Sequence, residues 1–437
     1  MQRGSLGQED WLAQRLPAAL VPLYRFCAVI ALPVAIGLAA VRMGLIIDGM
    51  APRYAIVDFR YFYVAGLAIL DGVSAYGDAY VTLGQSVYDS SFANALFYSP
   101  SVLPLLAPLG LMSAGPASAA FMALTATTII LSIAVSGWNL RHRPMVLDWR
   151  LVTAAAVVVG ACVLRPSISV LFLGNAKFLM LAGLVCWMAG ALRLRGSPPG
   201  SWRDDWASLL LQSVGLAVVL MKPQYGVVLF LVCVARAEWR AGAIGAVIVS
   251  GLLYTIAAIP HGLLTYGFDF LGSIAAYSGR PENSDEVLIG LYALAAQTGF
   301  SGGVIMTLTL SVLAAALILW LLPGRVDPVA TGLLCVALGI FVAPTHTTDT
   351  LLLVPALLLA GAAGPLWPRL LLVGAVLVLG LIDWALPPDL TLPAATLDLR
   401  MGLATLALFA TAAALMALAK QPLTTEGVAE PERPSLC

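Results

Sequence analysis

The chain has 437 residues, of which 60% are hydrophobic and only 11% are charged. Soluble domains carry about 25% charged residues, so this composition excludes an ordinary soluble enzyme. Twenty-three basic and 23 acidic residues give a net charge of zero. That balance argues against a nucleic-acid partner, which normally requires a basic excess. The composition therefore predicts an integral membrane protein.

Apolar stretches recur along the whole chain, and each membrane-spanning helix needs about 20 apolar residues. We place about 12 transmembrane helices at residues 26–46, 117–137, 150–164, 177–192, 206–221, 224–236, 241–259, 303–322, 329–344, 350–364, 369–386 and 401–419. The two segments around Lys222 and Pro223 are compatible with two spans or with one broken helix. The predicted fold is an all-α polytopic membrane protein. It has a cytoplasmic segment (1–25), a transmembrane domain (26–420) and a disordered cytoplasmic tail (421–437).

Arginines set the predicted orientation, because cytoplasmic loops carry an excess of Lys and Arg. With this set of spans, the arginine-rich loops near residues 138–150, 193–205 and 236–240 fall on one side. We therefore expect cytoplasmic termini and a bacterial-type inner (plasma) membrane. Residues 98–113 are apolar but short and contain three prolines. A full crossing there would reverse the arginine loops, so we interpret this segment as a helix that dips in or extends the next span.

The loops on the opposite, non-cytoplasmic side contain the unusual polar residues. The first, over about 47–97, has enough apolar and aromatic residues for one or two interfacial helices. Asp58 stands in this loop, where a helix N-cap is the ordinary interpretation. Lys177 and Lys222 lie at predicted outer ends of helices. Such a lysine either reaches the lipid headgroups or serves a functional site, and the helix break beside Lys222 favours the second interpretation.

His346 and Asp349 begin a predicted helix and are three residues apart, so their side chains can share one face. The pair could orient a substrate or bind a phosphate oxygen, and ordinary hydrogen-bonded packing is the alternative. Two ligands are too few for a metal site, and the six cysteines show no metal-binding spacing. We expect neither a metal nor another cofactor.

Taken in order, these features resemble the polytopic glycosyltransferases of family 87, within the GT-C fold class. The resembling motifs are Asp58-Phe59 with Tyr61 and Tyr63, Tyr98 with Pro100, Gly174-Asn175, Lys222-Pro223, Asn283-Ser284, and His346 with Asp349. The resemblance covers about residues 54–360. The family commonly has Tyr-Pro-Pro where this chain has Tyr98-Ser99-Pro100, and Gly-Gln where this chain has Gly174-Asn175.

The family includes mycobacterial polyprenyl-phosphate-mannose-dependent mannosyltransferases. The resemblance implies transfer of a hexose, with mannose as a candidate, from a polyprenyl-phosphate-linked donor. The acceptor would be a glycolipid or a lipid-linked glycan on the non-cytoplasmic face, with membrane lipids as the other partners. We expect inversion of the anomeric centre, because the phosphate leaves without a general acid and one carboxylate base is sufficient.

The same resemblance assigns roles to individual residues. Asp58, as the general base, and His346 are expected to be catalytic. The donor phosphate should be bound by Lys222, Lys177 and Arg280, because cations must face the departing anion. The expected substrate-binding residues are Phe59, Arg60, Tyr63, Tyr98, Asn175, Gln224, Asn283 and Asp349.

A multi-span secondary transporter or lipid flippase is the alternative function. Such proteins also have many spans and buried polar residues. The sequence shows no inverted repeat and few ionisable residues in mid-span, and the long first outer loop with Asp58 favours an enzyme. The two functions differ in one testable respect, because an enzyme consumes the lipid-linked sugar without an ion gradient.

Overall fold

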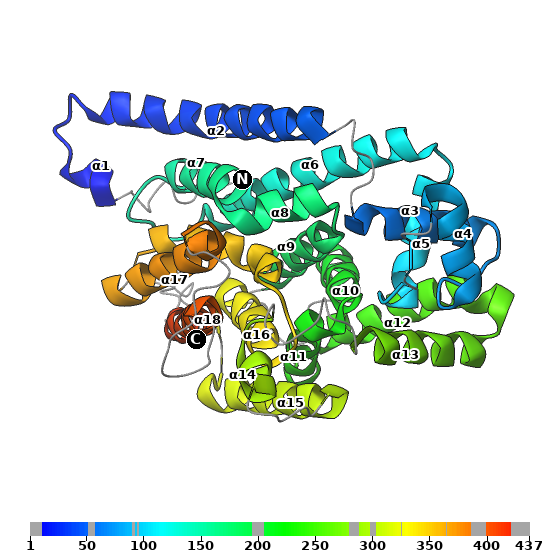
Figure 1. Ribbon diagram of the computed structural model, residues 1–437. Helices are drawn as coiled ribbons and strands as arrows, with labels where there is room; N and C mark the ends of the chain where they lie inside the picture. The colour runs from blue at the N-terminus through cyan, green and yellow to red at the C-terminus, as the bar shows by residue number, and fades with distance from the viewer. Residues whose placement is uncertain are drawn as a thin grey trace, which may run out of the picture.

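The computed structural model describes residues 11–50, 57–89, 92–93, 96–194, 205–278, 288–297, 303–324, 326–363, 365–385 and 399–420. These ranges form helices and connecting loops (Figure 1). Over the described residues, each segment predicted as a span lies mainly in a helix. The predicted cytoplasmic tail, residues 421–437, lies outside the described residues.

The first part of the described chain, up to Arg193, contains the following helices: α1 (Trp11–Arg15), α2 (Val21–Met50), α3 (Val57–Leu70), α4 (Asp78–Tyr88), η2 (Pro100–Val102), α5 (Leu103–Gly110), α6 (Ala114–Leu140), α7 (Trp149–Val158), η3 (Val159–Val163), α8 (Arg165–Leu173) and α9 (Lys177–Arg193). The expected interfacial segment thus holds two helices, α3 and α4. The proline-rich segment forms the short helices η2 and α5.

The second part contains the following helices: α10 (Trp206–Leu220), α11 (Pro223–Ala235), α12 (Arg240–Ala258), η5 (Ile259–His261), α13 (Leu263–Ser278), α14 (Leu291–Gln297), α15 (Gly303–Leu321), α16 (Pro328–Val342), η7 (Thr347–Gly361), α17 (Leu366–Ala385) and α18 (Leu399–Ala419). Lys222 and Pro223 separate α10 from α11. Pro223 is the first residue of α11, a position where a proline costs no hydrogen bond.

Four helices of the described chain are long and apolar enough to cross a bilayer by themselves: Val21–Gly49, Ala114–Leu140, Arg240–His261 and Leu399–Ala419. Trp149–Val163 and Arg165–Leu173 form a pair bent by 51°, which gives a fifth span if the pair crosses as one. Pro166 near the start of α8 accounts for the break, because proline supplies no backbone N–H. The remaining apolar helices are shorter, so the count of about 12 spans stays a prediction.

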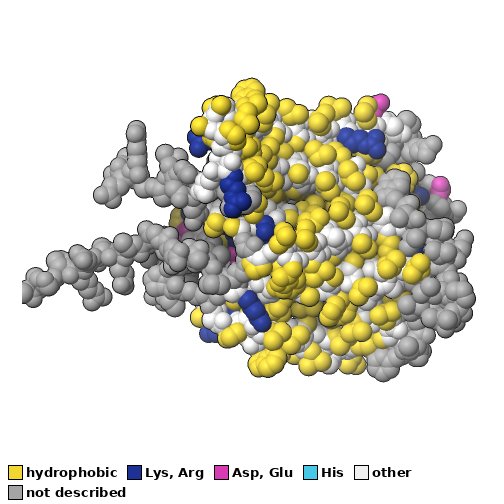
Figure 2. Space-filling view, turned by 90° about the vertical axis from the view of Figure 1, so that its left-hand side faces the viewer, with side chains coloured by type: hydrophobic (Ala, Val, Ile, Leu, Met, Phe, Trp, Pro, Cys, Tyr) yellow, Lys and Arg dark blue, Asp and Glu magenta, His cyan; other side chains and the backbone are white. Residues whose placement is uncertain are grey.

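The surface of the described chain is that of a membrane protein. Large hydrophobic side chains are exposed along the outer helices, and Leu38 and Leu45 of α2 are 59% and 64% exposed. Helix α2 lies at one edge of the bundle (Figure 1). Figure 2 shows a face covered largely by hydrophobic side chains, with separate groups of Lys and Arg. Extended apolar surface of this kind is typical of contact with lipid.

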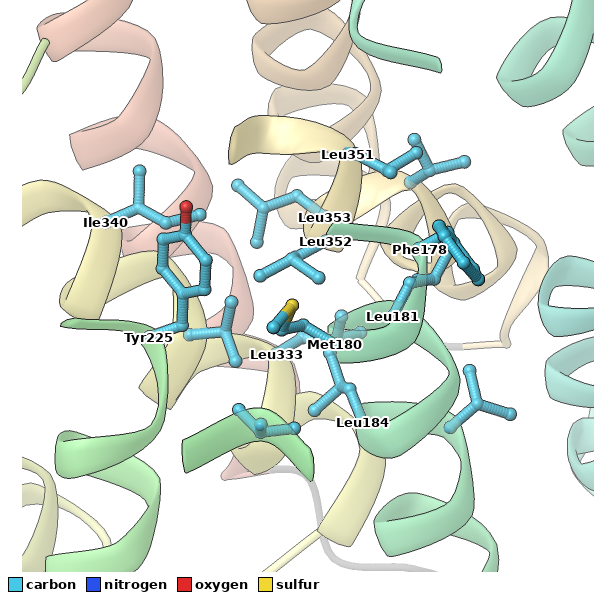
Figure 3. Close-up of a cluster of buried hydrophobic side chains, with 14 of the residues drawn as sticks. Phe178, Met180, Leu181, Leu184, Tyr225, Leu333, Ile340, Leu351, Leu352 and Leu353 are labelled. Atoms are coloured by element: carbon cyan, nitrogen blue, oxygen red, sulfur yellow. The ribbon is translucent and has the colours of Figure 1, made fainter. Parts of the chain in front are cut away.

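The packed centre of the bundle lies where α9, α11, α16 and η7 meet (Figure 3). Its fully buried side chains include Phe178, Met180, Leu181, Leu184, Tyr225, Leu333, Ile340, Leu351, Leu352 and Leu353. Helix α9 packs closely on α10 because glycines face each other. A Cβ on Gly183 would lie 2.7 Å from the Gly215 carbonyl oxygen, which is closer than a Cβ atom can approach a backbone atom. This packing fixes α9, whose first residue is Lys177.

Candidate active site

Asp58 lies in the first turn of α3, where the helix dipole favours a carboxylate. Its side chain is half-buried and its Oδ2 accepts a hydrogen bond of 2.6 Å from Nδ2 of Asn175. The two residues are 117 positions apart in the sequence. Asp58 is therefore part of a tertiary contact and does more than cap its own helix.

The Gly174-Asn175 motif turns the chain between α8 and α9. Gly174 has φ 66° and ψ 42°, a left-handed conformation that glycine adopts at no steric cost. Oδ1 of Asn175 accepts hydrogen bonds from the Tyr98 hydroxyl and from the Lys177 backbone N–H, both at 3.1 Å. Asn175 is buried, and its amide thus connects the Tyr-x-Pro motif to the Asp58 carboxylate.

A small pocket of about 10 Å³, with room for about one water molecule, opens beside Asp58. The rest of its lining is mainly aromatic and apolar and consists of Tyr61, Phe62, Leu96, Phe97, Tyr98 and Asn175. The pocket therefore places the Asp58 carboxylate beside aromatic rings.

A cluster of charged side chains adjoins this segment. Lys177 pairs with Oδ1 of Asp349 and donates a hydrogen bond to the Thr348 hydroxyl. Lys222 approaches the same carboxylate oxygen at 3.4 Å and donates a hydrogen bond to the Tyr225 hydroxyl. Asp349 is fully buried and Lys177 is 3% exposed. A lysine in the first turn of a helix opposes the helix dipole, so Asp349 compensates the charge of Lys177.

Lys222 lies in the turn between α10 and α11, outside the candidate spans. Burial lowers the pKa of its ammonium group to about 8, and the Asp349 carboxylate opposes this shift. The Asp58 carboxylate also acts on Lys222 electrostatically. Asp58 and the lysine cluster therefore belong to one electrostatic environment.

His346 and Asp349 form a reciprocal capping interaction at the start of η7. The Asp349 Oδ2 accepts a hydrogen bond of 2.9 Å from the His346 backbone N–H, and the His346 side chain accepts one from the Asp349 backbone N–H. The Asp349 backbone N–H also donates to the His346 carbonyl at 2.9 Å. The spacing of three residues thus lets each side chain bond to the backbone of the other residue.

The structure places the other predicted substrate-binding residues differently. Phe59 and Tyr63 are buried and do not line the pocket: Phe59 packs against Phe121, and the Tyr63 hydroxyl donates to the Met112 carbonyl at 2.9 Å. The guanidinium of Arg60 lies 5.8 Å from the centroid of the Tyr88 ring. Gln224 is half-buried beside Gly339 of α16. Two further predicted residues, Arg280 and Asn283, lie outside the described residues.

Several residues of this region were missed by the sequence reasoning. Phe62 follows Asp58 by four positions, which places it on the same face of α3 as Asp58 and beside Tyr61 of the predicted motif. That spacing was available in the sequence and would have selected Phe62. Thr348 and Tyr225 have no comparable signal, because their contacts with lysines depend on the tertiary packing of η7 and α11.

The lysine cluster is a better candidate for an anion than for a metal. Over the described ranges, no three His, Cys, Asp or Glu side chains come together as metal ligands. Two lysines share one carboxylate at Asp349, which leaves one positive charge for another anion. The site as a whole therefore combines a carboxylate in an aromatic pocket with a neighbouring cationic group.

A comparison with protein families matches residues 96–345 to glycosyltransferase family 87. No significant match is found among curated proteins or among solved structures. The matched range is more than half of the chain and contains Tyr98, Asn175, Lys177 and Lys222, whereas Asp58 precedes it. The helical fold, its apolar surface and this match define a membrane glycosyltransferase. The chain belongs to glycosyltransferase family 87.

Proposed function

We propose that this protein transfers a hexose from a polyprenyl-phosphate-linked donor to a hydroxyl of a glycolipid or lipid-linked glycan. The reaction takes place on the non-cytoplasmic face of a bacterial-type plasma membrane. The observation that carries the proposal is the position of Asp58, which lines an aromatic pocket while its charge acts on Lys222. A glycosyl acceptor needs a base, and a phosphate leaving group needs cations.

The charges of the lysine cluster match this donor. A polyprenyl-phosphate-linked sugar is a phosphodiester with one negative charge. Lys177 and Lys222 around Asp349 leave one positive charge, so the donor would neutralise the cluster. A second negative charge develops on the phosphate as its bond to the sugar breaks. A partly desolvated ammonium group stabilises that charge more strongly than the single charge of the ground state.

The proposed transfer is a single displacement. The acceptor oxygen attacks the anomeric carbon and loses its proton to Asp58. The bond between the anomeric carbon and the phosphate oxygen breaks, and its electron pair leaves with the polyprenyl phosphate. The anomeric configuration inverts because attack and departure occur on opposite faces of the sugar. His346 is proposed to donate a hydrogen bond to the leaving phosphate through the ring nitrogen that is not engaged with Asp349.

The test is an assay of the purified protein in proteoliposomes without an ion gradient. Polyprenyl-phosphate-mannose, -glucose and -galactose are offered together with a bacterial membrane lipid extract as acceptor. We expect one donor to be consumed, with release of polyprenyl phosphate and a product of inverted anomeric configuration. Consumption of none of these donors, or a product that retains the donor configuration, would contradict the proposal.

A further inference from the structure

The Asn175 side-chain amide is held in one orientation. Its Oδ1 accepts from two donors, the Tyr98 hydroxyl and the Lys177 backbone N–H, so this atom must be the carbonyl oxygen. The NH₂ group must then point the other way, where Nδ2 donates to Oδ2 of Asp58 at 2.6 Å. The amide cannot rotate by 180° without placing its oxygen against the Asp58 carboxylate.

The Tyr98 hydroxyl is placed as firmly as the amide. Tyr98 is 3% exposed, and its ring packs edge-on against Phe62 with a centroid distance of 5.0 Å. Its carbonyl accepts a hydrogen bond of 2.7 Å from the Tyr76 hydroxyl. The ring and backbone are therefore both fixed, so the hydroxyl has a defined direction towards Asn175.

We propose that Tyr98 and Asn175 are positioning residues that hold the Asp58 carboxylate at the pocket, rather than groups that bind substrate. Asn175 occupies Oδ2 of Asp58, which fixes the carboxylate plane for the acceptor hydroxyl. Tyr98 acts indirectly, because its hydroxyl holds the Asn175 side-chain amide in this orientation. The inference rests on the proposed function, in which Asp58 takes the acceptor proton.

The segment from Gly174 to Lys177 also connects Asp58 with the cluster of Lys177, Lys222 and Asp349. The Lys177 backbone N–H binds Asn175, while the Lys177 side chain pairs with Asp349. The left-handed turn at Gly174 is what brings the Asn175 side chain to Asp58. One short turn therefore sets the base and the cation cluster in a fixed relation, which in-line displacement requires.

Two substitutions test the inference. Asn175→Asp replaces the NH₂ group by an oxygen, so the hydrogen bond to Asp58 is lost and two carboxylates face each other, while the acceptor for Tyr98 and Lys177 is kept. Tyr98→Phe removes only the hydroxyl. Thr411→Val is the matched control, because it removes a buried hydroxyl that donates to a backbone carbonyl within α18 and not to Tyr98 or the Asn175 amide. All variants are assayed with the best donor of the three-sugar panel, and turnover is divided by the number of donor-binding sites, so that unfolded protein does not count.

We expect Asn175→Asp to lower turnover per binding site about 10²-fold, and Tyr98→Phe about tenfold, since small displacements of a reacting group cost factors of this size. Donor KM should stay within about twofold, because the lysine cluster is unchanged. Tyr98→Phe should have no further effect in the Asn175→Asp background, because a carboxylate has two equivalent oxygens and no orientation to hold.

Three outcomes separate the possibilities. Turnover of Asn175→Asp and Tyr98→Phe equal to that of Thr411→Val would overturn the positioning role. A rise in KM with unchanged turnover would overturn it as well, and would assign both residues to substrate binding. Normal turnover of Asp58→Asn, or no transfer by the wild-type protein, would instead contradict the proposed function itself.

Discussion

Lys222 and Asp349 are 127 positions apart in the sequence, yet Nζ of the lysine lies 3.4 Å from Oδ1 of the carboxylate. The same oxygen pairs with Lys177, so two cations share one anion. Lys222 is the more accessible of the two lysines, with 13% of its side chain exposed against 4% for Lys177. Lys222 is therefore the cation that the phosphate of the proposed donor would reach first.

Removal of this ammonium group should weaken donor binding. We expect Lys222→Ala to raise the donor KM by about 10- to 100-fold, the size of one charge-assisted hydrogen bond. Lys420→Ala is the matched control, because Lys420 is exposed at the end of α18. Steady-state kinetics with varied donor concentration check this prediction. An unchanged donor KM and turnover in Lys222→Ala would place the phosphate elsewhere.

The lowered pKa of Lys222 predicts a pH dependence. Because burial lowers this pKa to about 8, the ammonium is charged below pH 8 and increasingly neutral above it. The value of kcat/KM for the donor should therefore fall as the pH rises through about 8. Lys222→Arg should move this decline to higher pH, because arginine stays protonated. A flat kcat/KM from pH 7 to 9.5 in the wild-type protein would contradict this prediction.

Asp349 should also matter for stability. Asp349→Asn leaves two buried lysines without their shared anion, and breaking a buried ion pair costs about 3–5 kcal/mol of the free energy of unfolding. Glu238→Gln is the control, because Glu238 pairs with Arg236 at 3.2 Å but is exposed, and such pairs contribute at most about 1 kcal/mol. Thermal unfolding in the same detergent compares them, and equal melting temperatures would show that Lys177 and Lys222 are not charged together.

Much of the fold could be predicted from the sequence, because apolar runs of sufficient length have few alternatives in a membrane. The predicted spans lie in helices, with ends that differ by a few residues. The bend before Arg165 was not predicted, although Pro166 marks it. Hydropathy over a window reports only mean composition, so it cannot distinguish a straight span from a broken one.

The candidate site was predictable only in part. The sequence selected Asp58, Asn175, Lys177 and Asp349, and the structure joins them through hydrogen bonds and ion pairs. It did not predict that Asp349 would be shared by two lysines, because that contact depends on how η7 packs beside α9 and α11. Phe59 does not line the pocket, because a position next to Asp58 in sequence lies about 100° away around a helix.

The orientation can be tested independently of any substrate. In a protein without its native cysteines, Ser86→Cys on α4 should react with a membrane-impermeant thiol reagent added to intact cells. His142→Cys, in the arginine-rich loop, should react only after the membrane is opened. Both side chains are exposed, so access to reagent depends on the side of the membrane. Labelling of His142→Cys from outside would reverse the predicted topology and place the site in the cytoplasm.

Asp58→Asn tests the central claim most directly, because this change keeps the size of the side chain and removes its ability to take a proton. The measurement is the turnover number per donor-binding site, compared with Asp71→Asn at the exposed end of α3 as control. We expect Asp58→Asn to lose a factor of about 10² or more while it still binds the donor, and Asp71→Asn to match the wild-type protein. Asp58→Asn with wild-type turnover would show that Asp58 is not the general base.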